Sequence, residues 1–125
     1  NQGLRYELMA CYLAAGRRSD ARRLFSEYGE ERESAAWAWA RVLERFLSGD
    51  LPGAGEGARA ARRLNPHAAA YFLGKRKLPR AIPDSYTRGT REEAIIAWNI
   101  MRHAWDNHPA ARDWLRSLSG GAGGA

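Results

Sequence analysis

A phrase that recurs after 33 residues restricts the fold of this chain more than any other feature. Each copy consists of an apolar residue, a glycine and an alanine, which are Leu13, Gly16 and Ala21 in the first copy and Phe46, Gly49 and Ala54 in the second. The glycine joins the tail of one helix to the start of the next. Self-similarity with a period of about 34 residues is typical of helix-turn-helix solenoids, in which each unit buries its apolar face against its neighbours. The repeat therefore predicts an all-α, right-handed helical-repeat fold with a role in binding.

The spacing of apolar residues, together with turn and cap residues, divides the rest of the chain into further helices. The expected helices cover residues 4–15, 19–29, 34–48, 52–64, 66–73, 91–106 and 109–118. The first two pairs form repeats over about 4–29 and 34–64, and residues 65–118 form a C-terminal capping region of the same single domain. Within this capping region, residues 74–89 contain two prolines and no helical period, which predicts an irregular crossing. The glycine-rich residues 119–125 are expected to form a flexible tail.

Both copies resemble the tetratricopeptide repeat. The second copy carries a turn glycine, packing alanines and a closing proline, in the order Gly49-Asp50-Leu51, Ala54, Ala61, Leu64 and Asn65-Pro66. The first copy matches through Tyr12, Gly16, Ala21, Phe25 and Tyr28, and has Glu33 where the second copy has its proline. The resemblance implies two tetratricopeptide-like pairs, in which the first helix of each pair lines a concave groove.

By position, the residues that line this concave groove are Tyr6, Ala10, Leu13, Trp39, Leu43 and Phe46. They are apolar and aromatic, unlike the Lys, Asn and Arg set that clamps a peptide's terminal carboxylate in chaperone-binding members of the class. The resemblance therefore favours a protein or peptide partner that is an amphipathic helix or an apolar extended segment, with Trp39 and Phe46 as anchors. The alternative is that the chain's own helix at 91–106 covers these residues.

The C-terminal half carries a more specific resemblance. The stretches are NPHAAAYFLGKRKLP from residue 65, EEAIIAW from residue 92 and AWDNHPAARDWL from residue 104. Over residues 65–118 they resemble the C-terminal repeat-like region of the suppressor-of-tumorigenicity-seven family and of bacterial tetratricopeptide-like proteins with the same ending. The resemblance implies an all-helical scaffold with C-terminal capping helices, and it offers no catalytic residues to transfer.

An excess of positive charge lies in one segment of the chain. The net charge is +6, and residues 59–91 carry nine Lys and Arg against Asp84 alone. Three interpretations are open: side chains that are solvated or paired within the chain, as an arginine-rich composition allows; a contact with an acidic protein surface; and phosphate contacts with a nucleic acid. The residues expected to form an acidic-partner patch are Arg59, Arg62, Arg63, Lys75, Lys77 and Arg80.

Catalysis, cofactors and metals find little support in the sequence. His103 and His108 lie five residues apart, whereas a helical metal pair uses a spacing of four. We therefore expect a protein that is not an enzyme, with no catalytic site, cofactor or metal. No apolar run approaches the roughly 20 residues of a membrane-spanning helix. The single cysteine, Cys11, is expected to be a small core residue, and a reducing cytoplasm fits it.

The helix expected at 4–15 has an apolar stripe on one face, formed by Leu4, Leu8, Cys11 or Tyr12, and Ala15. The chain begins at Asn1 in helix-like sequence, which we interpret as a piece of a longer protein. Two repeats are fewer than the about three that a solenoid usually needs. The N-terminal face of this helix is therefore expected to be incompletely covered, and upstream repeats or a second copy of the chain would complete it.

Overall fold

The computed structural model describes residues 2–29 and 34–121 of the chain. Within these residues it consists of seven helices and no strand, which confirms the all-α prediction. The helices are α1 (Gln2–Ala14), α2 (Arg18–Glu27), α3 (Ala35–Leu47), α4 (Leu51–Leu64), α5 (Ala68–Phe72), α6 (Arg91–Asp106) and α7 (Pro109–Gly121).

The predicted tail is partly wrong. The α7 helix continues to Gly121, so the first residues of the stretch 119–125 are helical, and residues 122–125 lie outside the described part. Each residue added to an existing helix gains one hydrogen bond without a new nucleation step, and this offsets the low helix propensity of glycine.

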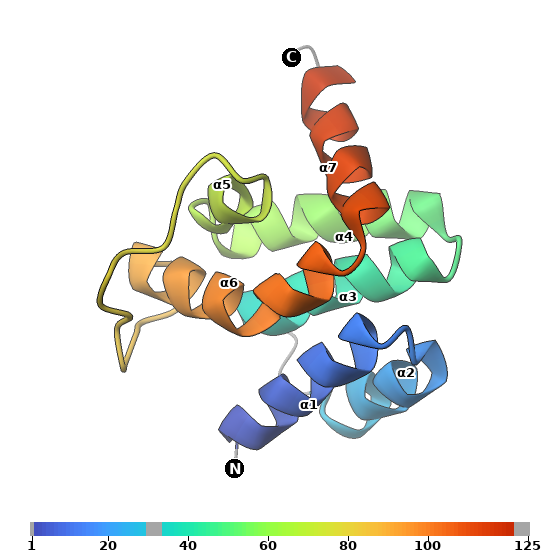
Figure 1. The fold of residues 1–125 in the computed structure, drawn as a ribbon, viewed down its shortest axis with the longest axis horizontal. Helices are drawn as coiled ribbons and strands as arrows, with labels where there is room; N and C mark the ends of the chain where they lie inside the picture. Colours follow the sequence, from blue (N-terminus) through green and yellow to red (C-terminus); the bar gives the residue numbers. More distant parts are fainter. Residues whose placement is uncertain (1, 30–33, 122–125) are drawn as a thin grey trace.

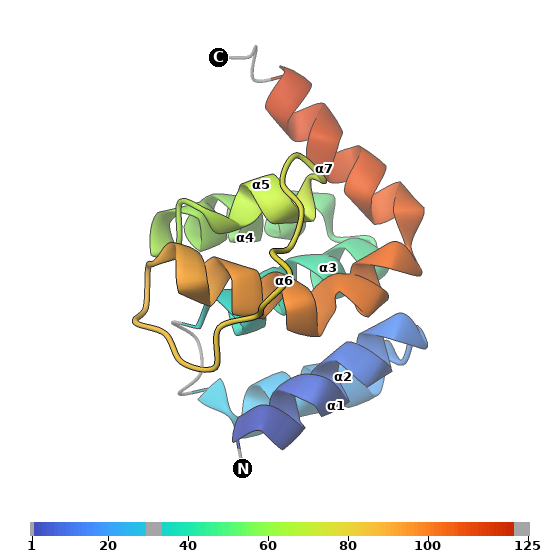
Figure 2. The ribbon, with the colours of Figure 1, turned by 60° about the vertical axis from the view of Figure 1, so that its left-hand side comes forward.

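The helices form two antiparallel pairs that a third layer holds together. Figures 1 and 2 show α1 beside α2 and α3 beside α4, with α6 running along both pairs. The α6 helix packs against α1, α3 and α5, and it points in the same direction as α1. The α7 helix projects away from the other helices at the C-terminal end of the chain.

The turn glycines of the repeated phrase end their helices in the same way. Gly16 and Gly49 have φ angles of 73° and 82°, which side chains other than glycine rarely adopt. The residue after each glycine donates its backbone N–H to the carbonyl five positions earlier, Arg17 to Tyr12 at 2.8 Å and Asp50 to Arg45 at 2.9 Å. This is the Schellman motif, and it explains why the phrase recurs.

Three helices, α3, α4 and α6, begin at a residue whose side chain caps the first turn. The Ser34, Asp50 and Thr90 side chains each accept a backbone N–H from the first turn of the helix that follows. Capping of this kind is worth about 1 kcal/mol per helix. Each of these helix starts is therefore determined by a residue of its own segment.

Phe72 lies at the centre of the aromatic core. Its ring stacks on Trp39 of α3 with 4.8 Å between centroids, and it meets Trp98 and Trp105 of α6 edge-on at 4.8 and 5.6 Å. Offset and edge-on pairs add about 0.5–1.5 kcal/mol beyond the area they bury. One residue of the short α5 therefore joins α3 to α6.

A second aromatic cluster joins the first helix pair to the second. The Trp37 ring of α3 lies 5.5 Å from Tyr6 of α1 and 5.2 Å from Phe25 of α2. All three side chains are buried. The α1/α2 pair is thus anchored on the first turn of α3.

A buried carboxylate joins three segments near the start of α6. Glu93 is 3% exposed. Its Oε1 accepts hydrogen bonds from Asn65 Nδ2 at 2.9 Å and from the Gly89 N–H at 2.8 Å. Its Oε2 accepts from the Ala35 N–H at 2.9 Å. These bonds connect the end of α4, the end of the irregular crossing and the first residue of α3.

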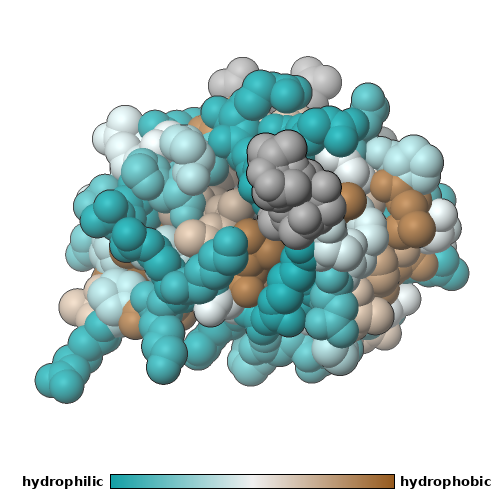
Figure 3. Space-filling model, turned by 90° about the horizontal axis from the view of Figure 1, so that it is seen from above, coloured by the Kyte–Doolittle hydropathy of each residue, from teal (hydrophilic) through white to brown (hydrophobic). Residues whose placement is uncertain are grey.

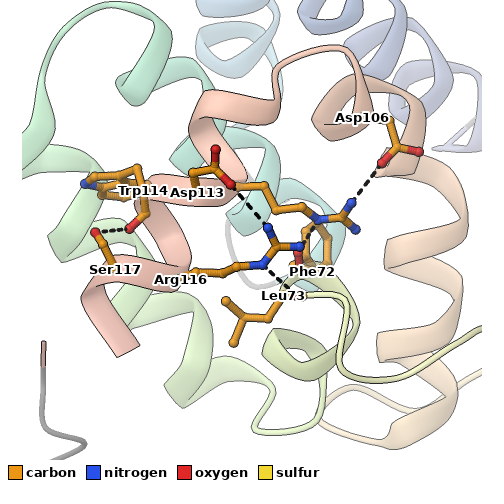
Figure 4. Close-up of polar contacts among 8 residues, drawn as sticks. Phe72, Leu73, Asp106, Asp113, Trp114, Arg116 and Ser117 are labelled. Carbon is orange, nitrogen blue, oxygen red and sulfur yellow. Dashed lines mark hydrogen bonds and ion pairs between the residues drawn. The ribbon is translucent and has the colours of Figure 1, made fainter. Parts of the chain in front are cut away.

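Two arginines of α7 bind the carboxyl end of α5. Arg112 Nε donates to the Phe72 carbonyl at 2.9 Å, and Arg116 Nε donates to the Leu73 carbonyl at 3.2 Å, as the dashed lines in Figure 4 show. The last carbonyls of a helix have no partner inside the helix and carry its negative end, so cations stabilise them. The projecting α7 is held to the domain in this way.

Candidate interaction surfaces

Most of the predicted concave-groove residues belong to the core. Tyr6 is 6% exposed, and Leu13, Trp39 and Leu43 are fully buried. The α6 helix lies over α1 and α3, which carry these side chains. The expectation of an open groove at these four residues is therefore wrong, and the alternative, that the helix at 91–106 covers them, describes the arrangement.

The physical reason lies in α6 itself. Its buried side includes Trp98, Met101 and Trp105, and the Trp105 ring lies 6.2 Å from the Trp39 ring of α3. A helix with so wide an apolar face gains more by burying it than by leaving it in water. The chain thus supplies its own occupant for the predicted groove.

The remaining groove residues, Phe46 and Ala10, lie at its edges. Phe46 is partly buried, and its ring lies 5.4 Å from the Trp114 ring of α7. Ala10 is 8% exposed and lines a different cavity, described below. Phe46 is therefore a contact between helices in this structure, and it is only partly available to a partner.

The predicted acidic-partner patch consists of residues that are all exposed. We call the set Arg59, Arg62, Arg63, Lys75, Lys77 and Arg80 the basic surface. Three of its members come from α4 and three from the irregular crossing after α5. Figure 3, which views the molecule from above relative to Figure 1, shows a face made mostly of hydrophilic side chains.

Several members of the basic surface have charges that no other described residue neutralises. Arg59, Lys75 and Arg80 make no ion pair with any other described residue. By contrast, Arg22 on α2 pairs with the buried Glu44 at 3.0 Å. The positive charge of these three side chains is therefore available to a partner.

The outer side of α1 is apolar and uncovered. We call Leu4, Leu8, Cys11 and Ala15 the α1 stripe. Leu4 is 66% exposed, Leu8 is 41% exposed, and Cys11 and Ala15 are exposed as well. This agrees with the expectation of an incompletely covered N-terminal face.

The expectation that Cys11 is a core residue is wrong. Cys11 is exposed, because α1 buries the opposite side of the helix, including Met9 and Leu13. Both sides of α1 are apolar at helical spacing, so periodicity alone could not decide which one faces the core.

A groove of about 550 Å³ lies beside the α1 stripe, between α1 and α6. We call it the α1–α6 groove. Its lining residues are mostly small or apolar: Glu7, Ala10, Cys11, Ala14, Ala15, Ile100, His103 and Asn107. The pairing of α1 with α6 that forms the groove has no local signal in the sequence.

Polar side chains at one end of this groove bind the last carbonyls of α1. Cys11 makes no hydrogen bond to His103 within the described residues, and Asn107 Nδ2 donates to the Ala14 carbonyl at 3.2 Å. The neighbouring His108 donates from Nε2 to the Leu13 carbonyl at 2.8 Å. Asn107 and His108 therefore cap the carboxyl end of α1.

Residues 2–29 and 34–121 hold neither a cluster of metal-ligating side chains nor a membrane-spanning helix. No group of three or more His, Cys, Asp or Glu side chains comes together there in a way that could hold a metal ion. No helix among these residues combines the length and apolar character needed to cross a membrane.

Comparison with protein-family models, with curated proteins and with solved structures finds no match to this chain.

Proposed function

We propose that this chain is a protein–protein interaction module that binds an acidic protein surface through the basic surface. The observation that carries the proposal is the exposure of all six basic side chains in a stretch with a single acidic residue, Asp84. A surface of one charge attracts an opposite surface over long distances and raises the association rate. With the concave groove occupied by α6, this surface is a better candidate for a partner than Trp39 or Leu43.

We propose further that the module is a tetratricopeptide-like scaffold, with α1/α2 and α3/α4 as its pairs and α5–α7 as its C-terminal cap. The two pairs support this class because they share the same Schellman turn, at Gly16 and Gly49. Ala21 and Ala54, at matching positions in the second helix of each pair, are both fully buried. The cytoplasm is the location that we propose, since its reducing conditions preserve the exposed thiol of Cys11.

The alternative function is that of a nucleic-acid-associated accessory protein that uses the same basic surface. The positive charge would neutralise phosphates, whatever the base sequence. Tyr71 and Phe72, the aromatic residues nearest this surface in the sequence, are buried and do not offer rings on which bases could stack. The acidic-protein proposal is therefore preferred.

Affinity purification followed by mass spectrometry tests the proposal. The wild-type chain is compared with the double variant Arg59→Ala/Arg63→Ala, which removes two charges from exposed positions of α4. The matched control Arg23→Ala/Arg102→Ala removes two charges from exposed positions of α2 and α6. We expect a protein that co-purifies with the wild type and the control, and that the Arg59→Ala/Arg63→Ala variant loses.

The same experiment separates the alternative. If nuclease treatment abolishes the co-purification, and the chain binds a DNA duplex with an affinity that falls steeply with salt, the nucleic-acid function is favoured. If the variant and the control retain the same proteins, the basic surface is not the binding surface.

A further inference from the structure

The α1 stripe and the α1–α6 groove lie side by side on one face of the molecule. Cys11 and Ala15 belong to both of them. The protruding Leu4 and Leu8 therefore stand next to a hollow lined by small residues. Large side chains at one end of the stripe and small ones at the other are self-complementary about a two-fold axis perpendicular to α1, since each copy offers a knob and a hole.

We propose that this face pairs with the same face of a second copy of the chain, with the two α1 helices antiparallel. This inference goes beyond the proposed binding of an acidic partner and uses a different surface. The two-fold axis would pass α1 midway between Leu8 and Cys11.

The order of side-chain sizes along the stripe supports the antiparallel direction. Leu4 and Leu8, at the N-terminal end, are large, and Cys11 and Ala15, at the C-terminal end, are small. Antiparallel pairing places Leu4 opposite Ala15 of the second copy and Leu8 opposite Cys11 of the second copy. A parallel pair would set leucine against leucine and alanine against alanine, which leaves both a clash and a void.

The polar residues of the groove fit the same register. Asn107 lies level with Ala14, because its amide donates to the Ala14 carbonyl. Antiparallel pairing places Glu7 of the second copy opposite Tyr12, which is roughly 3 Å along the helix axis from the level of Ala14. The Glu7 carboxylate can then accept a hydrogen bond from Asn107, or from His103 one turn earlier.

The size of the contact predicts a weak dimer. The α1 helix has 13 residues and is therefore roughly 20 Å long. Two helices of this length, with a contribution from α6, bury less than the about 800 Å² per partner of a standard stable interface. We therefore expect a dimer that depends on protein concentration.

Sedimentation equilibrium of the 125-residue chain over about two decades of concentration tests the contact. We expect the wild-type mass to rise from one chain towards two, and Leu8→Arg to remain a single chain. The matched control is Leu51→Arg, which makes the same chemical change at a residue of α4 that is 47% exposed. Far-ultraviolet circular dichroism verifies that both variants are folded.

A mixing experiment tests the direction of the helices and needs no disruptive charge. One chain carries Leu4→Cys with Cys11→Ala, and the other carries Ala15→Cys with Cys11→Ala. We expect mild oxidation to join the two chains when they are mixed, and to join neither chain to itself. Direct opposition is required, because a disulfide needs Cα atoms about 4.4–6.8 Å apart.

Three results would overturn the proposal. The first is a single-chain mass at every concentration. The second is a dimer that Leu8→Arg leaves intact. The third is oxidation that joins each cysteine variant to itself and not to the other, which would indicate a parallel pair.

Discussion

The Asn65 side chain donates from Nδ2 to Oε1 of Glu93 across 2.9 Å, and both residues are buried. The same nitrogen donates to the Thr90 carbonyl at 2.8 Å, while Asn65 Oδ1 accepts the His67 N–H at 2.9 Å. Only a carboxamide supplies donors and an acceptor together in this way. Asn65 therefore fixes the start of α6 relative to the end of α4.

Removal of the Glu93 carboxylate should destabilise the fold strongly. Glu93→Ala leaves the N–H groups of Ala35 and Gly89 buried without their acceptor, and we expect a loss of about 3 kcal/mol or more in the free energy of unfolding. Urea denaturation measures it. Glu92→Ala, at the exposed neighbouring position of the same helix, is the control and should change stability by less than about 0.5 kcal/mol. Equal losses in the two variants would contradict a special role for Glu93.

Truncation of Phe72 should be costly, whereas a more conservative change at Trp39 should not. Phe72→Ala removes the ring that contacts three tryptophans, and we expect a loss of about 3–5 kcal/mol. Trp39→Phe retains an aromatic ring and removes an indole N–H that has no hydrogen-bond partner within the described residues. We expect Trp39→Phe to lose clearly less stability than Phe72→Ala, as measured by calorimetry of thermal unfolding. A larger loss for Trp39→Phe would show that the core does not centre on Phe72.

Alanine should have opposite effects at two glycines of the second repeat. At Gly49 a Cβ would meet nothing within 4 Å, yet φ is +82°, so we expect Gly49→Ala to cost about 1–2 kcal/mol. At Gly55, inside α4, a Cβ would meet only Arg59 Nη1 at 4.0 Å, and we expect Gly55→Ala to stabilise by about 0.5–1 kcal/mol. Guanidinium denaturation compares them, and a change of the same sign in both variants would refute the account.

Limited trypsin digestion should cut the irregular crossing first. Lys75, Lys77 and Arg80 are exposed and lie outside the helices. Proteases need an extended backbone, which helical sites such as Arg59 offer only after local unfolding. Mass spectrometry of the earliest fragments should therefore show new ends between residues 75 and 81. Early cleavage at Arg59 or Arg63 would mean that α4 opens more readily than the crossing.

The helices could be predicted from sequence because their ends are determined locally. Gly16 and Gly49 stop helices, while Ser34, Asp50 and Thr90 start them, and each does so with a hydrogen bond or a φ angle inside its own segment. Segment boundaries consequently agree with expectation to within one or two residues, the end of α7 excepted.

The candidate site could be predicted only in part, because it depends on how distant segments pack. The sequence around Trp39 is compatible with a groove residue, and Trp39 is buried because α6 packs against α3. Cys11 shows the converse, since its side of α1 looks as apolar as the side that is buried. The six residues of the basic surface are exposed, as charged side chains usually are.

The placement of α6 also has a consequence for competition. Residues 73–90 tether α6 to the helices on which it packs. A helix tethered in this way is present at its packing site at an effective concentration of about the millimolar range. A free peptide that bound between α1 and α3 would have to displace α6, which remains attached to the chain. Such a peptide could enter that space only after the tether between α5 and α6 had been cut or α6 had unfolded locally.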